Sequence, residues 1–301
     1  MFLLIIMNLS YALLFPLSKI ALDYSSPIFL TGFRMTLAGI LVLLYQYFFR
    51  RQLFIFPRHH FWPFFLSSFL GIYVTNVLDF WGFTYMTATK SCFLYNLYPF
   101  AAAFFAWFYF SERLSTRKWL GLALGFLGAL PMILTSQQVE SIPIFGGSLP
   151  LPELAVLVAI VASTYGCVFT RQLVCHEGYD PVMVNGSIML MGGIMALGHS
   201  LLVEQWHPLP ISNVKGFFLS SLGMMLVSNV IGNTAYVELL RRYSMTFLSF
   251  TAFSEPLLTA LFDWLFFNIK VSYTFYLSVA VVFVGLYLFY KEELELQAQR
   301  T

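Results

Sequence analysis

The sequence repeats itself at an offset of about half its length. Residues 66–77 read LSSFLGIYVTNV, and residues 219–230 read LSSLGMMLVSNV. A second group of matches holds nearly the same offset and pairs Tyr11, Pro27, Gly32, Met35 and Gly39 with Tyr165, Pro181, Gly186, Met189 and Gly193. Chance would not produce the same offset in two separate places, so we infer that one structural unit occurs twice.

The composition indicates that this unit lies in a membrane. Hydrophobic residues make up 59% of the 301 residues and charged residues only 10%, whereas soluble domains are about 25% charged. A membrane-crossing helix needs about 20 mostly apolar residues. The sequence therefore predicts an all-α integral membrane protein with ten transmembrane helices, at roughly 2–22, 28–49, 61–83, 87–110, 116–134, 151–173, 182–203, 215–240, 245–267 and 271–290.

The ten predicted helices divide into two halves. We expect a first five-helix repeat at 1–138, a linker loop at 139–150, a second five-helix repeat at 151–290 and a cytoplasmic tail at 291–301. Because five is odd, the repeats must be inverted relative to one another, an arrangement typical of transporters with a site at mid-membrane. Most loop Lys and Arg residues fall on one side, which predicts that both termini are cytoplasmic.

Local motifs support a family assignment. The segment 95–99 (YNLYP) is followed by an aromatic run, then by Ser111-Glu112 and a helix with glycines at 121–128. Ser254-Glu255-Pro256 stands at the matching place in the second half. Together with the repeat, these segments resemble the drug/metabolite transporter superfamily, in particular its EamA-type members. The chain departs from that pattern because Ser111 replaces a usual Gly and Ile269 replaces the second-half counterpart of Glu112.

The resemblance implies a function. Within the superfamily, the aromatic-rich third and fourth helices are most similar to S-adenosylmethionine transporters of obligate intracellular bacteria. This resemblance implies secondary transport by alternating access in a bacterial inner membrane, with S-adenosylmethionine exchanged for S-adenosylhomocysteine. An exporter of amino acids or amphiphilic drugs on the same fold remains an alternative.

Charged residues inside predicted helices are the first site candidates, because each costs at least about 2.5–3.5 kcal/mol at the bilayer centre. Glu255 beside Pro256 is expected either to contact substrate or a proton, or to be a protonated packing group. Asp79, followed by Trp81 and Tyr85, suits a cationic group, because aromatic faces attract cations. Alternatively, Asp79 pairs with Arg34 or Lys90. Arg34 itself could clamp a carboxylate with two hydrogen bonds.

Uncharged polar and aromatic side chains complete the predicted substrate site. The aromatic walls are expected from Tyr73, Trp81, Tyr85, Tyr95 and Tyr98. Further hydrogen-bonding groups are expected from Tyr11, Asn76, Asn96, Tyr165, Asn229 and Asn233. Several are related by the repeat, as a symmetric central cavity would require. The alternative role, contact between helices, contributes only about 0.6 kcal/mol per hydrogen bond on average.

Other functional classes have less support. No catalytic constellation, phosphate loop or set of metal ligands is visible in the sequence, so an enzyme is disfavoured and no cofactor or metal is expected. A passive channel is the other alternative, and it would not saturate. The 16 basic residues are dispersed, which argues against nucleic acid. The expected partners are a small-molecule substrate and the lipid bilayer, and a homodimer stays open beside a monomer.

Overall fold

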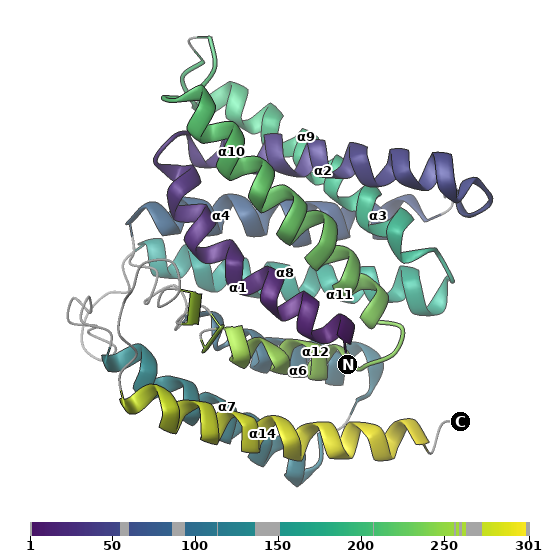
Figure 1. The fold of residues 1–301 in the computed structure, drawn as a ribbon. Coiled ribbons are helices and arrows are strands. Elements are labelled where there is room, and N and C mark those ends of the chain that lie inside the picture. The colour runs from purple at the N-terminus through teal and green to yellow at the C-terminus, as the bar shows by residue number, and fades with distance from the viewer. Residues whose placement is uncertain are drawn as a thin grey trace.

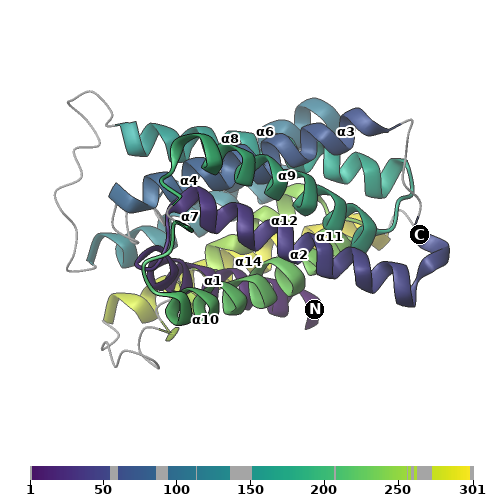
Figure 2. The same ribbon diagram turned by 90° about the horizontal axis from the view of Figure 1, so that it is seen from above.

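The computed structural model describes residues 2–54, 60–85, 94–112, 114–135, 151–206, 208–255, 257–258, 261–262 and 273–298. Within them the regular structure is helical throughout, apart from one isolated antiparallel bridge between Ser25 and Ile211. The all-α fold predicted from the sequence is therefore confirmed. Figures 1 and 2 show a bundle of roughly parallel and antiparallel helices.

The first half of the chain supplies α1 (Phe2–Leu22), α2 (Pro27–Phe49), the short η1 (Arg51–Leu53), α3 (Phe61–Leu66), η2 (Ser67–Val74), α4 (Thr75–Tyr85), α6 (Tyr98–Phe110) and α7 (Thr116–Thr135). The second half supplies α8 (Leu151–Arg171), η3 (Gln172–His176), α9 (Pro181–Val203), α10 (Val214–Met224), η4 (Met225–Asn233), α11 (Thr234–Leu239), α12 (Met245–Thr251), η5 (Ala252–Ser254) and α14 (Tyr273–Ala298).

Several of these helices are built to cross a membrane. Five are long and apolar enough, at Pro27–Phe49, Phe61–Tyr85, Leu151–His176, Pro181–Val203 and Val214–Leu239. Shorter apolar helices lie in four more of the predicted spans. The chain is thus a multi-pass membrane protein, and the count of ten stays a prediction because parts of the fourth and ninth spans lie outside the described residues.

A glycine-lined seam joins α2 to α9, which lie side by side in Figures 1 and 2. A Cβ added at Gly39 would lie 2.5 Å from the backbone nitrogen of Leu190, and one at Gly193 would lie 2.4 Å from that of Thr36. The two contacts are equivalent in the repeat, because Gly39 corresponds to Gly193 and Thr36 corresponds to Leu190. Such reciprocity is what a two-fold axis across an antiparallel helix pair produces.

The remaining helices pack in the same reciprocal way. In the bundle, α1 packs on α10, η4 and α11, while α8 packs on α3, η2 and α4. Helix α6 contacts α12, and α7 lies along α14 at one side of the bundle (Figure 1). Each of these contacts has a counterpart at the repeat-related helices, and the helices that carry the site candidates meet in the middle.

Polar contacts fix one end of α2. Pro27 starts this helix, and Ser26 gives its first turn no side-chain cap. Glu204, at the end of α9, supplies the missing acceptors, taking hydrogen bonds from the backbone nitrogens of Ile28 at 2.9 Å and Phe29 at 2.8 Å. A carboxylate satisfies both the unpaired N–H groups and the positive dipole end of a helix, so the two halves are joined at this point.

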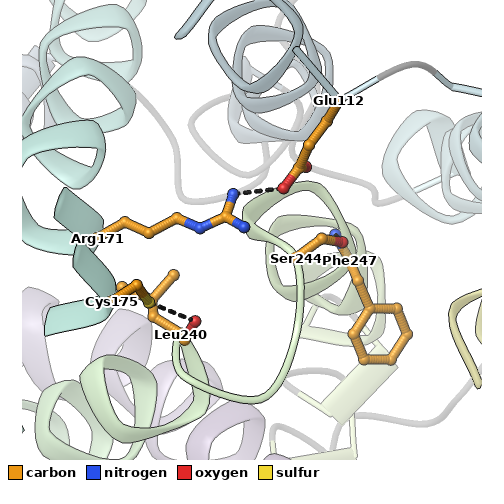
Figure 3. A network of polar contacts seen from close by, with 6 residues as sticks. All are labelled: Glu112, Arg171, Cys175, Leu240, Ser244 and Phe247. Carbon is orange, nitrogen blue, oxygen red and sulfur yellow. Dashed lines mark hydrogen bonds and ion pairs between the residues drawn. The ribbon is translucent and has the colours of Figure 1, made fainter. Parts of the chain in front are cut away.

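A second polar network joins the halves at the end of the bundle where α6 and α8 finish (Figure 3). Ser111 ends α6 in the left-handed conformation with φ of 53°, which glycine adopts more easily. Glu112 follows and forms an ion pair with Arg171 at 2.6 Å. The guanidinium of Arg171 lies 4.4 Å from the centre of the Phe110 ring, and Cys175 donates to the carbonyl of Leu240.

Candidate functional site

A cavity of about 240 Å³ lies between the two halves. Its walls come from α1, α2, α6, α8, α9 and α12 and from the two interrupted helices that contain η2 and η4. Ten of the predicted site residues line it: Tyr11, Arg34, Asn76, Asp79, Tyr95, Asn96, Tyr98, Asn229, Asn233 and Glu255. The structure thus brings together candidates that are far apart in the sequence.

Irregular helical segments form part of the cavity wall. The segments η2 and η4 are π-helical and lie in repeat-related helices. Such segments loosen the regular backbone bonding and frequently occur at functional sites. Thr75 ends the first of them, and its hydroxyl donates to the carbonyl of Leu70 at 2.7 Å. In the second half, the 3₁₀ turn η5 comes directly before Glu255.

Arg34 is buried in the cavity wall with only 1% of its surface exposed. Its Nη2 donates to Oδ1 of Asn76 at 2.8 Å, and Nδ2 of Asn76 donates to the carbonyl of Ile72. The guanidinium also lies 5.0 Å from the centre of the Phe80 ring. These contacts orient Arg34, yet its Nε has no hydrogen-bond partner.

Asp79 lines the same cavity and is 6% exposed. The hydroxyl of Tyr95 donates to its Oδ2, while Oδ1 has no partner. No ion pair joins Asp79 to Arg34, although both belong to the described part of the chain. The other proposed counter-ion, Lys90, lies outside the described residues. Both ionisable groups therefore keep an unpaired polar atom in the cavity wall.

Glu255 lines the same cavity and directly follows α12 and η5 in the second half of the chain. Tyr11, Tyr95 and Tyr98 line the cavity together with Glu255. Tyr11 donates to Oδ1 of Asn233 at 2.9 Å. The carboxylate thus stands among tyrosine rings, an arrangement that suits a positively charged ligand group.

The paired asparagines of the repeat both reach the cavity but bond differently. Asn76 holds Arg34, whereas Nδ2 of Asn229 lies 3.3 Å from the sulfur of Met35 and its Oδ1 has no partner. Asn96, also in the wall, has an unpartnered Nδ2. The cavity therefore offers both donors and acceptors that the protein itself leaves unused.

Four predicted site residues lie outside the cavity lining. Trp81 and Tyr85 pack on one another with ring centres 5.2 Å apart. Tyr73 shares a hydrogen bond of 3.1 Å with Nδ1 of His199. Tyr165 accepts a hydrogen bond from Tyr109 and stacks on Phe105. Their role in substrate binding stays a prediction.

The cavity also contains residues that the sequence prediction missed. Tyr236 lies edge-on to Tyr11 with ring centres 6.5 Å apart, and its hydroxyl is 2.8 Å from the sulfur of Cys167. Tyr236 follows Asn229 and Asn233 at helical spacing, so the face of that helix could have identified it. Among the described residues, no group of three His, Cys, Asp or Glu side chains could hold a metal ion.

Comparisons with known proteins identify a family and relatives of this chain. The model of the EamA-like transporter family matches residues 1–134 and 151–291. An S-adenosylmethionine/S-adenosylhomocysteine transporter of Chlamydia muridarum is 38% identical over 93% of this chain and 87% of its own length. Its counterpart from Chlamydia trachomatis is 34% identical over 93% of this chain and 85% of its own length.

Fold comparison reaches more distant proteins. A solved crystal structure with 16% sequence identity superposes with a TM-score of 0.78 and covers 96% of this chain and 97% of its own. At this identity the likeness concerns the fold alone. The stretch between the two family matches, residues 135–150, contains the linker loop predicted at 139–150.

Proposed function

Because the chain belongs to the EamA-like transporter family, we propose that it exchanges S-adenosylmethionine for S-adenosylhomocysteine through the central cavity. The named relatives from Chlamydia support this substrate pair, since they match 93% of the chain. The observation that carries the proposal is the cavity itself, in which one guanidinium and two carboxylates stand among tyrosine rings.

The charges of the cavity suit this substrate. Arg34, Asp79 and Glu255 together carry one net negative charge when all three are ionised. S-adenosylmethionine has a sulfonium, an ammonium and a carboxylate, which sum to one positive charge. Its adenine ring can stack on tyrosine, and a cation against an aromatic face gains about 2 kcal/mol or more when water is excluded.

Movement of the substrate is proposed to follow from the inverted repeat. The reciprocal contacts between α2 and α9 support two halves related by an axis in the membrane plane. In such transporters, one half moves against the other around a central site. We further propose that the membrane is the bacterial inner membrane and that both termini are cytoplasmic. The start of α1 and the end of α14 lie toward the same end of the bundle (Figure 1), in keeping with that topology.

Exchange in proteoliposomes tests the proposal. Vesicles that contain the purified protein and internal S-adenosylhomocysteine should take up labelled S-adenosylmethionine with saturable kinetics, faster than vesicles without internal substrate. The exchange moves one net positive charge, so an inside-negative potassium diffusion potential should accelerate uptake. Robust transport of a plain amino acid by a protein that ignores S-adenosylmethionine would instead assign the cavity to an amino-acid exporter.

A further inference from the structure

We propose that Arg34 and Asp79 form a subsite for the α-amino-acid end of the substrate, with its carboxylate on Arg34 and its ammonium on Asp79. The sulfonium end then lies toward Glu255. This inference rests on the proposed function and deepens it, because it assigns an orientation to the ligand. Both exchanged molecules share the amino-acid end, so this subsite would hold both.

The first support is the pair of unpartnered atoms. Nε of Arg34 and Oδ1 of Asp79 have no hydrogen bond, although Arg34 is 1% and Asp79 is 6% exposed. Buried polar groups are normally paired, and a buried charged group without a partner is costly. Both residues line the cavity, so a ligand there can supply an acceptor for Arg34 and a donor for Asp79.

The second support is their spacing. Asn76 and Asp79 are three residues apart in α4, so their side chains are neighbours on one helix face. Asn76 accepts a hydrogen bond from the guanidinium of Arg34 at 2.8 Å, so the guanidinium lies against the same helix that carries Asp79. An α-amino acid carries its ammonium and its carboxylate on the same carbon atom. It can therefore bridge the two side chains, which do not pair with one another.

The third support is the balance of charge. A zwitterionic end neutralises Arg34 and Asp79 together, and Glu255 then remains, among the described cavity residues, as the carboxylate that can face the sulfonium. Tyr95 connects the two regions, since its hydroxyl donates to Asp79 and it lines the same cavity as Glu255. Only a short aliphatic chain separates the amino acid from the sulfonium, so neighbouring subsites fit one ligand.

Ligand variants matched to protein variants test this orientation. Decarboxylated S-adenosylmethionine lacks the carboxylate but keeps the ammonium and the sulfonium. Affinities would be measured by calorimetry on the full chain in detergent. We expect Arg34→Met to weaken S-adenosylmethionine roughly 10- to 100-fold, the range for a lost hydrogen bond between charged groups. The same variant should bind the decarboxylated ligand like the unchanged protein.

Asp79→Asn gives the complementary pattern. Because both ligands keep the ammonium, this variant should weaken both by a similar factor. Asp23→Asn makes the same chemical change at an exposed residue outside the cavity lining, so it is the matched control and should change neither affinity. If Arg34→Met fails to fold, Arg34→Lys replaces it and should weaken S-adenosylmethionine more than the decarboxylated ligand, because the planar two-pronged donor is lost.

Two failures are distinguishable. If the folded, unchanged protein binds neither ligand, the proposed function is wrong. If it binds S-adenosylmethionine but the Arg34 variants weaken both ligands equally, the function stands and the subsite is wrong, since Arg34 then acts only on the structure of the cavity.

Discussion

The seam between α2 and α9 gives a sharp prediction about stability, because two glycines of α9 differ in what surrounds them. A Cβ at Gly193 would lie 2.4 Å from the backbone nitrogen and 2.5 Å from the hydroxyl of Thr36, whereas a Cβ at Gly198 would meet nothing within 4 Å. Gly193→Ala must push the helices apart, and overpacking of this kind costs about 1–3 kcal/mol. Gly198→Ala should gain about 0.4–1 kcal/mol because it restricts the unfolded chain.

The two variants should therefore differ by about 1.4–4 kcal/mol in the free energy of unfolding. Thermal unfolding of the purified protein in one detergent, followed by tryptophan fluorescence, measures the difference as a lower Tm for Gly193→Ala. The repeat partner Gly39, whose Cβ would lie 2.5 Å from Leu190, should behave like Gly193. Equal Tm values for the Gly193 and Gly198 variants would refute the tight seam.

Three further predictions concern the site and the end of the bundle. Glu255→Gln should weaken S-adenosylmethionine about tenfold and S-adenosylhomocysteine little, because only the former carries the sulfonium; equal loss in a competition assay would contradict this role. Glu112→Gln and Arg171→Gln should each lower the free energy of unfolding by about 1 kcal/mol, and the double variant by less than their sum, in a thermal double-mutant cycle. Trp81→Ala should weaken substrate binding less than Tyr98→Ala does, as measured by calorimetry. The opposite order of the two affinities would show that Trp81 contacts the ligand.

Much of the fold could be predicted from the sequence because membrane helices are recognised by the length and the apolar composition of their segments. The predicted bounds of the first two spans, 2–22 and 28–49, agree closely with α1 and α2. Irregular segments within a helix could not be predicted in this way. The π-helical segment η2 lies inside the predicted span 61–83, and its sequence is as apolar as that of an ordinary helix.

The same interruption explains the limits of the site prediction. The three charged candidates Arg34, Asp79 and Glu255 all line the cavity, since charged groups in a bilayer almost always face the protein interior or a water-filled cavity. Aromatic residues carry no such constraint, and their direction depends on the rotation of the helix. A π segment takes more residues per turn, so the positions of Tyr73 and Trp81 could not be inferred from regular helical spacing.

The repeat in the sequence also predicts a more symmetric site than the structure contains. Tyr11 and Tyr165 are repeat partners, yet Tyr11 lines the cavity and Tyr165 packs beside Phe105. Repeat-related helices α1 and α8 thus present different faces to the centre. A transporter that alternates between two states must have unequal halves in either of them, and the sequence alone does not say which face belongs to which state.

The reciprocal contacts of α2 and α9 also bear on how the two copies could diverge after a duplication. Gly32 contacts Leu197, and Gly186 contacts Leu43, so each small residue makes room for a side chain of the other copy. A larger residue in one copy would collide with the other copy at once, which leaves little freedom for drift along this seam. Elsewhere the copies have diverged, since Ile269 stands at the second-half position that corresponds to Glu112. We therefore expect the similarity between the two copies to be best preserved where the two halves are in close contact.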